Sequence, residues 1–223
     1  MTESLTAQFE ALHAERERSW DPAKLRTNID QRRALVEAFD PNIVVKVGDE
    51  VEPFTLDLST GGSVTLDDLT ADGPVALIFF RFAGCPACNL ALPYYDRTIA
   101  SALREAGIRL VAVSPHLVER GLDDIRLRHA LTFEVATDRD NRLARRFGLA
   151  FEPANIVFPQ GDDHWIGALT GTGSFELPQP AVVLIDQNHV VRFADISPDW
   201  LRRTEAPAIL AAVDRLEVLA SSS

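Results

Sequence analysis

The chain contains two cysteines, and both lie in the segment FRFAGCPACN, residues 80 to 89. Cys85 and Cys88 are three positions apart, and Pro86 directly follows the first. Residues three apart on a helix bring their Cβ atoms to about 5–6 Å, so such a pair can close a disulfide after a small adjustment. One sulfur can attack a substrate while the other resolves the mixed species. The spacing predicts a dithiol that cycles with its disulfide.

The reactive form of a cysteine is the thiolate, yet a free thiol with a pKa of about 8.5 is mostly protonated at neutral pH. A helix N-terminus lowers that pKa, because backbone N–H groups and the positive end of the dipole face the sulfur. Gly84 frees the turn, Cys85 takes the cap, and Pro86 takes the first helical position, where its missing N–H costs nothing. Arg81 precedes the motif, and its guanidinium would stabilise a thiolate if it points toward the sulfurs.

Two other roles for the cysteine pair are less favoured. A structural zinc site needs four ligands, and the five histidines of the chain show no ligand spacing around the two cysteines. Buried cysteines can also act as small hydrophobic side chains. Chance rarely places a lone pair at a strand-to-helix junction with a proline between them. We therefore expect neither a metal nor another cofactor at this site.

The composition limits the classes of partner. The 223 residues carry a net charge of −11, which repels the phosphates of nucleic acids and anionic lipids. Substrates should be neutral, or be drawn in by a local positive site against the overall field. The polar N-terminus lacks the apolar stretch of a signal peptide, and no segment has the roughly 20 apolar residues of a membrane helix. We expect a cytoplasmic protein, in which a disulfide would be transient and catalytic.

Hydrophobic periodicity predicts the elements that position the cysteines. Residues 1–40 show helical spacing and should form two helices, the second started by Asp21 as cap and Pro22 as first residue. Residues 46–70 carry turn signals between short alternating runs and predict an edge hairpin. Buried strands and helices should then alternate in this order: strand 74–82, helix 86–106, strand 108–114, helix 117–130, strand 133–136 and helix 139–147.

The C-terminal part of the chain has a different pattern. Residues 150–178 are rich in Pro, Gly, Asp and Thr and show no period, which predicts a long functional loop. Residues 180–186 and 189–196 flank a short turn and should pair as an antiparallel hairpin. Residues 206–219 should form a closing helix.

A parallel β-α-β half followed by a β-β-α half, with CxxC after the first buried strand, is the layout of a thioredoxin fold. We predict an α/β protein with a central mixed sheet flanked by helices. A helical extension (residues 1–44) and an edge hairpin should precede the rest of the thioredoxin-like domain (45–220). In this fold a cis-proline faces the cysteine pair at the place of Pro180, so we expect the Gln179–Pro180 bond to be cis.

Segments along nearly the whole chain resemble the peroxiredoxin-like branch of the alkyl hydroperoxide reductase/thiol-specific antioxidant family. They are KVGDEVEPFTL, FFRFAGCPACNLAL, LVAVSP, DRDNRLARRFGL and LPQPAVVLIDQNHVVRFADISPDWLRR. The resemblance implies an antioxidant thiol oxidoreductase that reduces hydroperoxides or disulfides. It also implies a thioredoxin- or glutathione-type reductant and points toward a homodimer.

The resemblance leaves two assignments of the attacking cysteine. In the family pattern the attacking residue corresponds to Cys88, with Cys85 where a threonine usually stands and Arg81 where a proline does. The family's second arginine, expected before the strand at 181–186, has no counterpart there. In the thioredoxin pattern Cys85 is the nucleophile and Cys88 the resolver, although Gly84 replaces the usual tryptophan. We favour Cys85, because the cap position should face solvent, and keep Cys88 for a peroxide substrate.

A second hypothesis is a redox-responsive binding or regulatory protein with little turnover. It rests on the missing threonine hydroxyl and the missing arginine, both of which help to activate peroxide in the family. It also rests on the long 150–178 segment, which carries Trp165 and Phe175 and could cover the cysteines or bind a partner.

Overall fold

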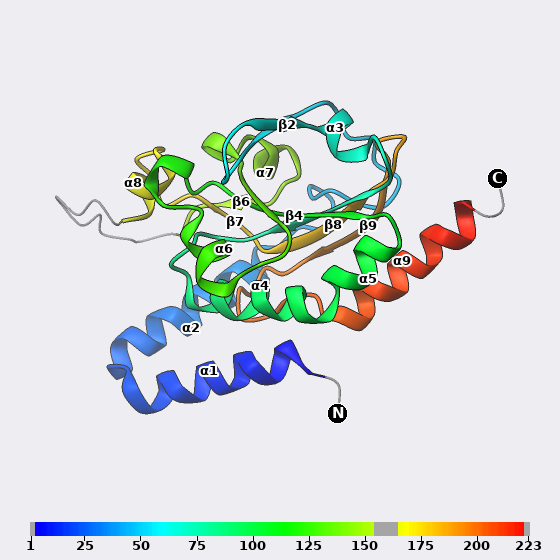
Figure 1. Ribbon diagram of the computed structural model, residues 1–223. Helices are drawn as coiled ribbons and strands as arrows, with labels where there is room; N and C mark the ends of the chain where they lie inside the picture. Colours follow the sequence, from blue (N-terminus) through cyan, green and yellow to red (C-terminus); the bar gives the residue numbers. More distant parts are fainter. Residues whose placement is uncertain (1–2, 154–164, 221–223) are drawn as a thin grey trace.

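The computed structural model describes residues 3–153 and 165–220 of the chain. Within them, seven strands form one mixed sheet in the order β2-β1-β5-β4-β3-β8-β9, with helices on both faces (Figure 1). These strands are β1 (Thr55–Leu58), β2 (Ser63–Thr65), β3 (Val75–Phe79), β4 (Arg109–Ser114), β5 (Glu134–Thr137), β8 (Ala181–Ile185) and β9 (Val191–Ile196). The predicted α/β fold with a central mixed sheet is confirmed.

The strand directions follow the predicted layout. β3 runs parallel to β4, and β4 runs parallel to β5. β8 pairs antiparallel with β3, and β9 pairs antiparallel with β8. β1 and β2 form the predicted hairpin at one edge of the sheet. The parallel half and the hairpin half thus meet at β3, the strand that leads to the cysteines.

Two sets of helices enclose the sheet. The α-helices of the described residues are α1 (Leu5–Ser19), α2 (Pro22–Glu37), α3 (Leu66–Thr70), α4 (Pro86–Thr98), α5 (Ala100–Glu105), α6 (Asp124–His129), α7 (Arg142–Arg146), α8 (Ile166–Thr170) and α9 (Ala206–Ala220). α4, α5 and α9 cover one face, and α3 and α7 lie on the other (Figure 1). The helix expected at 86–106 is two helices, since the chain leaves helical geometry at Ile99 (φ −128°). The helix expected at 117–130 is a 3-10 turn, η1 (Val118–Arg120), followed by α6.

The sequence of β3 is continuously apolar because the strand is buried on both faces of the sheet. All five of its residues are buried. Side chains alternate between the two faces of a strand, so Ala76 and Ile78 pack in the layer with α4. Leu77 and Phe79 pack in the layer on the opposite face. A strand buried on both faces holds the loop that follows it, and this loop carries Cys85.

The N-terminal helices begin where the sequence predicts. Asp21 caps α2, because its Oδ1 accepts hydrogen bonds from the backbone N–H groups of Ala23 and Lys24. α1 lies along α4 and places Leu5 and Phe9 in the layer that α4 also lines. By contrast, α2 has no fully buried residue. The domain boundary at residue 44 stays a prediction.

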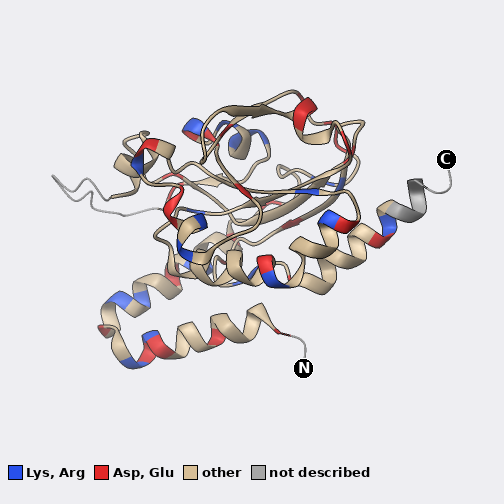
Figure 2. Ribbon diagram, viewed as in Figure 1, with Lys and Arg blue, Asp and Glu red and all other residues tan. Residues whose placement is uncertain are grey.

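Charges are distributed over the whole molecule. Acidic positions lie on helices and loops on all sides of the view in Figure 2, in keeping with the net charge of −11. No helix in the described ranges combines the length and apolar character that a membrane span requires.

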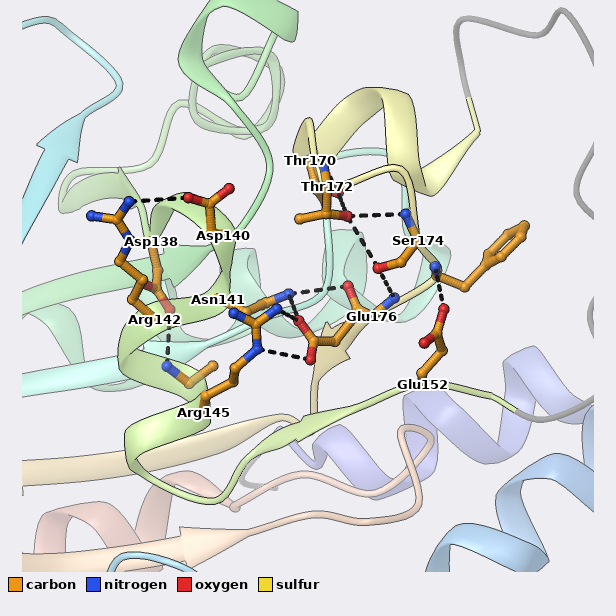
Figure 3. Close-up of polar contacts among 12 residues, drawn as sticks. Asp138, Asp140, Asn141, Arg142, Arg145, Glu152, Thr170, Thr172, Ser174 and Glu176 are labelled. Carbon is orange, nitrogen blue, oxygen red and sulfur yellow. Dashed lines mark hydrogen bonds and ion pairs between the residues drawn. The ribbon is translucent and has the colours of Figure 1, made fainter.

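The segment after Gly148 is more ordered than predicted. Its described residues include β6 (Ala150–Phe151) and β7 (Leu177–Pro178), which pair antiparallel, and the short helix α8. Glu176 ties this segment to α7. Its carboxylate accepts hydrogen bonds from Arg145 Nε (3.0 Å) and Nη2 (2.6 Å), and from Asn141 Nδ2 at 3.2 Å (Figure 3). The expected loop was therefore wrong for β6, α8 and β7 but holds for residues 171–176, whereas residues 154–164 lie outside the described residues.

The prediction of a cis peptide bond before Pro180 was wrong. No peptide bond in the described residues is cis. Gln179 directly follows β7, and its backbone N–H donates to the carbonyl of Leu149 at 2.7 Å. The backbone of Pro180 accepts from the N–H of Ser197 at 2.7 Å. These bonds hold an extended path from β7 into β8, which suits the trans form that most X–Pro bonds adopt.

Candidate active site

Cys85 and Cys88 lie where β3 gives way to α4. Cys85 occupies the N-cap and Pro86 the first turn, as the sequence predicts. Both cysteines are free thiols. The expectation that the cap position exposes Cys85 was wrong, since Cys85 is 2% exposed and Cys88 is 0% exposed. The Cys85 side chain lies in the apolar layer shared by α1 and α4, while Gly84 and Pro86 beside it are exposed.

The environments of the two thiols shift their pKa values in opposite directions. A hydrogen bond to Cys88 and burial both raise the pKa of Cys85 well above its ordinary value. Burial would also raise the pKa of Cys88. The hydrogen bond from Cys85, the charge of Arg203 and a backbone bond from Arg81 outweigh burial and lower that pKa to about 5. These causes favour the thiolate form at Cys88 and the protonated form at Cys85.

Arg203 is an arginine that sequence reasoning did not single out. It stands between β9 and α9, and its Nη2 donates to Cys88 Sγ at 3.6 Å. Its Nε donates to the carbonyl of Trp200 at 3.2 Å, which fixes the guanidinium. The family's second arginine has no counterpart before β8. Arg203 follows the C-terminal hairpin, which returns the chain to the end of the sheet where β3 leads to the cysteines.

Arg81 contributes in two ways. Its backbone N–H lowers the pKa of Cys88, and its guanidinium charge lowers the pKa of both thiols. The guanidinium lies over the ring of Trp200, 4.5 Å from the centroid, and Trp200 is itself buried. Arg81 thus stands at the predicted position, with its charge near the sulfurs and its side chain held by an aromatic ring.

Arg16 brings a third guanidinium to the site from the N-terminal extension. It is 5% exposed, and its Nη1 forms no hydrogen bond within the described part of the chain. Burial lowers its pKa, while the charge of Cys85 acts in the opposite direction. The guanidinium packs on the ring of Trp20, 4.7 Å from the centroid. In the described ranges Arg16, Arg81 and Arg203 form no ion pair with a carboxylate.

His116 positions the loop before the cysteines. Its Nδ1 accepts the backbone N–H of Ala83 at 3.2 Å, and its Nε2 lies 3.0 Å from the carbonyl of Arg120. Because Nδ1 is an acceptor, Nε2 carries the proton and donates to that carbonyl. Burial lowers the pKa of His116, which keeps the ring neutral. Ser114 adds a second tie, since its Oγ donates to the carbonyl of Arg81 at 3.0 Å.

Asn89 braces the start of α4. Its Nδ2 donates to the carbonyls of Ala83 (2.8 Å) and Cys85 (2.9 Å). Its Oδ1 accepts from Arg128 Nη1 at 2.7 Å and lies 2.8 Å from His129 Nε2. Both polar atoms of this amide thus have partners, and the side chain of Asn89 holds the turn that carries Cys85.

Sequence reasoning found both cysteines, Arg81 and Pro86, and the structure brings these four together. Pro180 lies buried at the start of β8, whose first residue, Ala181, pairs with Phe79 at the end of β3. Four contributors were missed, namely Arg203, Arg16, His116 and Asn89. Of these, Asn89 had a sequence signal, because it directly follows the second cysteine. No group of histidine, cysteine or acidic side chains in the described residues has the arrangement of a metal site.

Several solved structures that match this chain are peroxiredoxins. The chain superposes on peroxidoxin BcpB of Mycobacterium tuberculosis with a TM-score of 0.60 and 22% identity, covering 77% of this chain and 97% of that one. Peroxiredoxin Q of Xanthomonas campestris gives a TM-score of 0.55 and 19% identity, over 73% of this chain and 90% of that one. Both comparisons show a shared thioredoxin-like fold.

A curated relative and a family model agree with this fold. The chain is 23% identical over 121 residues to the thiol-disulfide oxidoreductase ResA of Halalkalibacterium halodurans. That match covers 53% of this chain and 66% of the relative, which is just under two thirds of its length. The model of the AhpC/TSA family matches residues 47–194, more than half of the chain and including both cysteines. The chain therefore belongs to the AhpC/TSA family of thiol-dependent oxidoreductases.

Proposed function

We propose that the protein is a thiol-dependent peroxidase in which Cys88 attacks the peroxide and Cys85 resolves the product. One observation carries the proposal: Arg203 Nη2 donates to Cys88 Sγ at 3.6 Å. The charge of Arg203 and the backbone N–H of Arg81 both lower the pKa of Cys88. A thiolate is the nucleophile in peroxide reduction. The same cationic groups can stabilise the negative charge that develops on the peroxide oxygens.

The chemistry uses two electrons of the Cys88 sulfur. The thiolate attacks the terminal peroxide oxygen, the O–O bond breaks, and the departing alkoxide or hydroxide takes a proton from solvent to leave as the alcohol or water. Cys88 becomes a sulfenic acid. The sulfur of Cys85 then attacks Cys88, its proton joins the departing hydroxyl as water, and a Cys85–Cys88 disulfide forms. One turn of helix separates the two residues, so small movements are enough.

An external thiol must supply the two electrons that restore the dithiol. The sulfur of the more acidic thiol leaves faster. The reductant is therefore expected to attack Cys85, releasing Cys88 as the thiolate. We assign this role to a thioredoxin- or glutathione-type reductant in the cytoplasm. A homodimer is part of the same proposal, and the reductive half-reaction alone would also serve a disulfide reductase.

Stopped-flow fluorescence tests the proposal, because buried Trp200 stacks on Arg81 beside the sulfurs. Hydrogen peroxide should oxidise the reduced protein far faster than a free thiol, with a mass loss of two hydrogens. Cys88→Ser should abolish the reaction, whereas Cys85→Ser should stop at a sulfenic acid that a dimedone probe traps. A rate no faster than that of a free thiol would reject the peroxidase.

A redox-responsive binding protein is the second candidate, and the burial of both thiols favours it. Leu5 and Phe9 of α1 share the apolar layer that holds the cysteines. Oxidation would then alter the packing of α1 and expose this layer to a partner. Hydrogen exchange of α1 in the dithiol and disulfide forms tests the idea. Equal protection in both forms would eliminate it.

A further inference from the structure

A cavity of about 640 Å³ lies between α2 and the segment from Asp195 to Arg203. Small-molecule pockets measure about 300–1,000 Å³, so this space suits an organic molecule. Neither cysteine lines the cavity. Arg203 does line it, and its Nη2 also donates to Cys88 Sγ at 3.6 Å. A ligand in the cavity can therefore contact this arginine without reaching either sulfur.

The charge in this cavity opposes that of the whole molecule. Its lining includes four arginines and two aspartates, in a chain of net charge −11: Arg32, Arg33, Arg202, Arg203, Asp195 and Asp199. Basic positions follow α2 in Figure 2. A local positive field of this kind concentrates anions against a global negative one.

Two of these arginines have donors available for a ligand. Arg32 pairs with Asp199 through Nη1 at 3.1 Å, yet its buried Nε has no hydrogen-bond partner in the described residues. Arg202 is exposed and forms no ion pair within the described ranges. A buried guanidinium N–H without a partner is costly, and a carboxylate satisfies such donors well.

Two further guanidiniums near Arg32 also lack a carboxylate. Arg16 and Arg81 form no ion pair in residues 3–153 and 165–220. Within these residues, buried Arg16 Nη1 and buried Arg81 Nε have no hydrogen-bond partner. Burial lowers the pKa of Arg16 most, and the charges of Arg32 and Arg81 lower it further. Buried charge without a counter-charge is costly. An anion beside Arg32 and Arg203 would supply part of the missing negative charge.

The apolar part of the lining comes from Ile29, Val36, Ile196 and Pro198. Val36 is 50% exposed, which is unusual for a large aliphatic side chain. These side chains favour a ligand with an apolar body. A guanidinium matches a planar carboxylate with two parallel N–H···O bonds. The cavity therefore suits a small organic acid that carries one carboxylate on an apolar body.

The cavity also lies outside the part of the chain that the family shares. The AhpC/TSA model matches residues 47–194, whereas every lining residue comes from α2 or from position 195 onward. The site is thus an addition to the family frame, built by the N-terminal extension and the C-terminal segment.

We propose that this cavity is an effector site for a small apolar carboxylate held by Arg32 and Arg202, and that the bound carboxylate competes with the Cys88 thiolate for Arg203. In the dithiol form the Cys88 sulfur engages this arginine. In a disulfide the sulfur has no charge, so the ligand should bind this form more tightly. Because coupling is reciprocal, the bound acid also weakens the contact of Arg203 with Cys88. The inference goes beyond the proposed peroxidase, since it needs the dithiol and disulfide forms but no peroxide.

Calorimetry with a matched pair of probes tests the carboxylate site. The disulfide form, prepared with diamide, should bind 4-isopropylbenzoate about tenfold more tightly than neutral 4-isopropylbenzamide, the scale of one charged hydrogen-bonded contact. Arg32→Gln should weaken binding of the acid about tenfold and leave binding of the amide unchanged. Arg26→Gln, at an exposed arginine of α2 outside the cavity, should change neither.

Equal affinities for the acid and the amide, or an affinity for the acid that survives Arg32→Gln, would overturn the site. If Arg32→Gln does not fold, Arg202→Gln carries the test under the same criteria, because Arg202 is exposed.

The competition for Arg203 is tested by comparing redox forms. The wild-type dithiol should bind 4-isopropylbenzoate about tenfold more weakly than the disulfide, within the usual range of coupling between sites. Cys88→Ser has neither a thiolate at this position nor a disulfide, so it should bind the acid as tightly as the wild-type disulfide. Arg203→Met should remove the difference between the two redox forms.

Equal binding to both wild-type forms, or a difference that persists in Arg203→Met, would overturn the competition. None of these measurements uses a peroxide. A protein that binds the acid in this way but reacts slowly with peroxide keeps the effector site and loses the peroxidase function. A fast peroxidase that does not bind the acid keeps its function and loses the effector site.

Discussion

Arg203 Nη2 lies 3.6 Å from Cys88 Sγ, although 115 positions separate the two residues in the chain. The contact links the segment before the last helix to the first turn of α4. It places a fixed positive charge on the second cysteine of the motif rather than the first. The roles that we propose for the two thiols, attack by Cys88 and resolution by Cys85, rest on this contact and on the hydrogen bond between the two thiols.

Replacing Arg203 by Met should raise the pKa of Cys88, because the positive charge that favours the thiolate is lost. A rise of about two units would reduce the thiolate fraction at pH 6 roughly tenfold. The absorbance of the thiolate at 240 nm and the oxidation rate, both followed against pH, measure the change. Arg104→Met, at an exposed arginine of α5, is the control. Identical pH profiles for Arg203→Met and the wild type would contradict the assignment.

The hydrogen bond between the thiols predicts a difference between two substitutions of Cys85. Cys85→Ala removes the donor and should shift the pKa of Cys88 upward from about 5. Cys85→Ser keeps an O–H that can donate in its place, so its profile should lie closer to the wild type. Sulfenic acid formation against pH is the measurement, since it needs Cys88 alone. Equal profiles for the alanine and serine variants would show that Cys85 donates nothing.

His116→Ala should loosen the loop before Cys85. It leaves the buried N–H of Ala83 without an acceptor, which costs about 1–3 kcal/mol of unfolding free energy. It should also raise the pKa of Cys88, because the backbone of Arg81 is no longer held in place. His116→Asn restores an acceptor near the place of Nδ1 and should recover part of both effects. Urea unfolding and thiolate absorbance measure them. A loss of stability without any change in the Cys88 pKa would limit His116 to a structural role.

Glu205 should make the docking of α1 depend on pH. Its carboxylate accepts from the N–H groups of Leu5 and Thr6 and from the hydroxyls of Ser4 and Tyr94. Burial opposes ionisation, but these donors prevail and lower the pKa of Glu205 to about 2. A lowered carboxyl pKa contributes stability above its unfolded value, about 4.3, and loses it as pH falls toward 2.

Glu205→Gln should therefore lower the unfolding free energy at pH 7 by about 1.5–3 kcal/mol, the scale of hydrogen bonds to a charged group. The difference from the wild type should shrink as pH falls below about 4.3, where the native carboxylate begins to lose its advantage. Denaturant unfolding at pH 7 and at pH 3 measures it. Glu10→Gln, on an exposed position of α1, serves as control. A difference that is the same at both pH values would refute the linkage.

Much of the fold could be predicted because its signals are local. The apolar run of β3 marks a strand buried on both faces, and Asp21 with Pro22 marks the start of α2. The spacing of Cys85 and Cys88 is likewise local, and so is the junction that carries them. Each of these features depends on residues within a few positions of one another.

The rest depends on packing between distant segments. Arg202 and Arg203 are neighbours of the same type, and the sequence does not tell which one turns toward the sulfurs. The burial of Cys85 depends on α1, about 70 positions away in sequence, which shares its apolar layer. These outcomes follow from tertiary contacts, which composition and periodicity do not predict.

The place of Arg203, close to the end of a chain of 223 residues, has a consequence for biosynthesis. A ribosome delivers both cysteines more than a hundred residues before the arginine that acidifies one of them. Until the last hairpin and α9 have folded, neither sulfur has that charge beside it, and both behave as ordinary, weakly reactive thiols. On the proposed function, we therefore expect slow oxidation of Cys88 in the nascent chain until Arg203 has packed beside it.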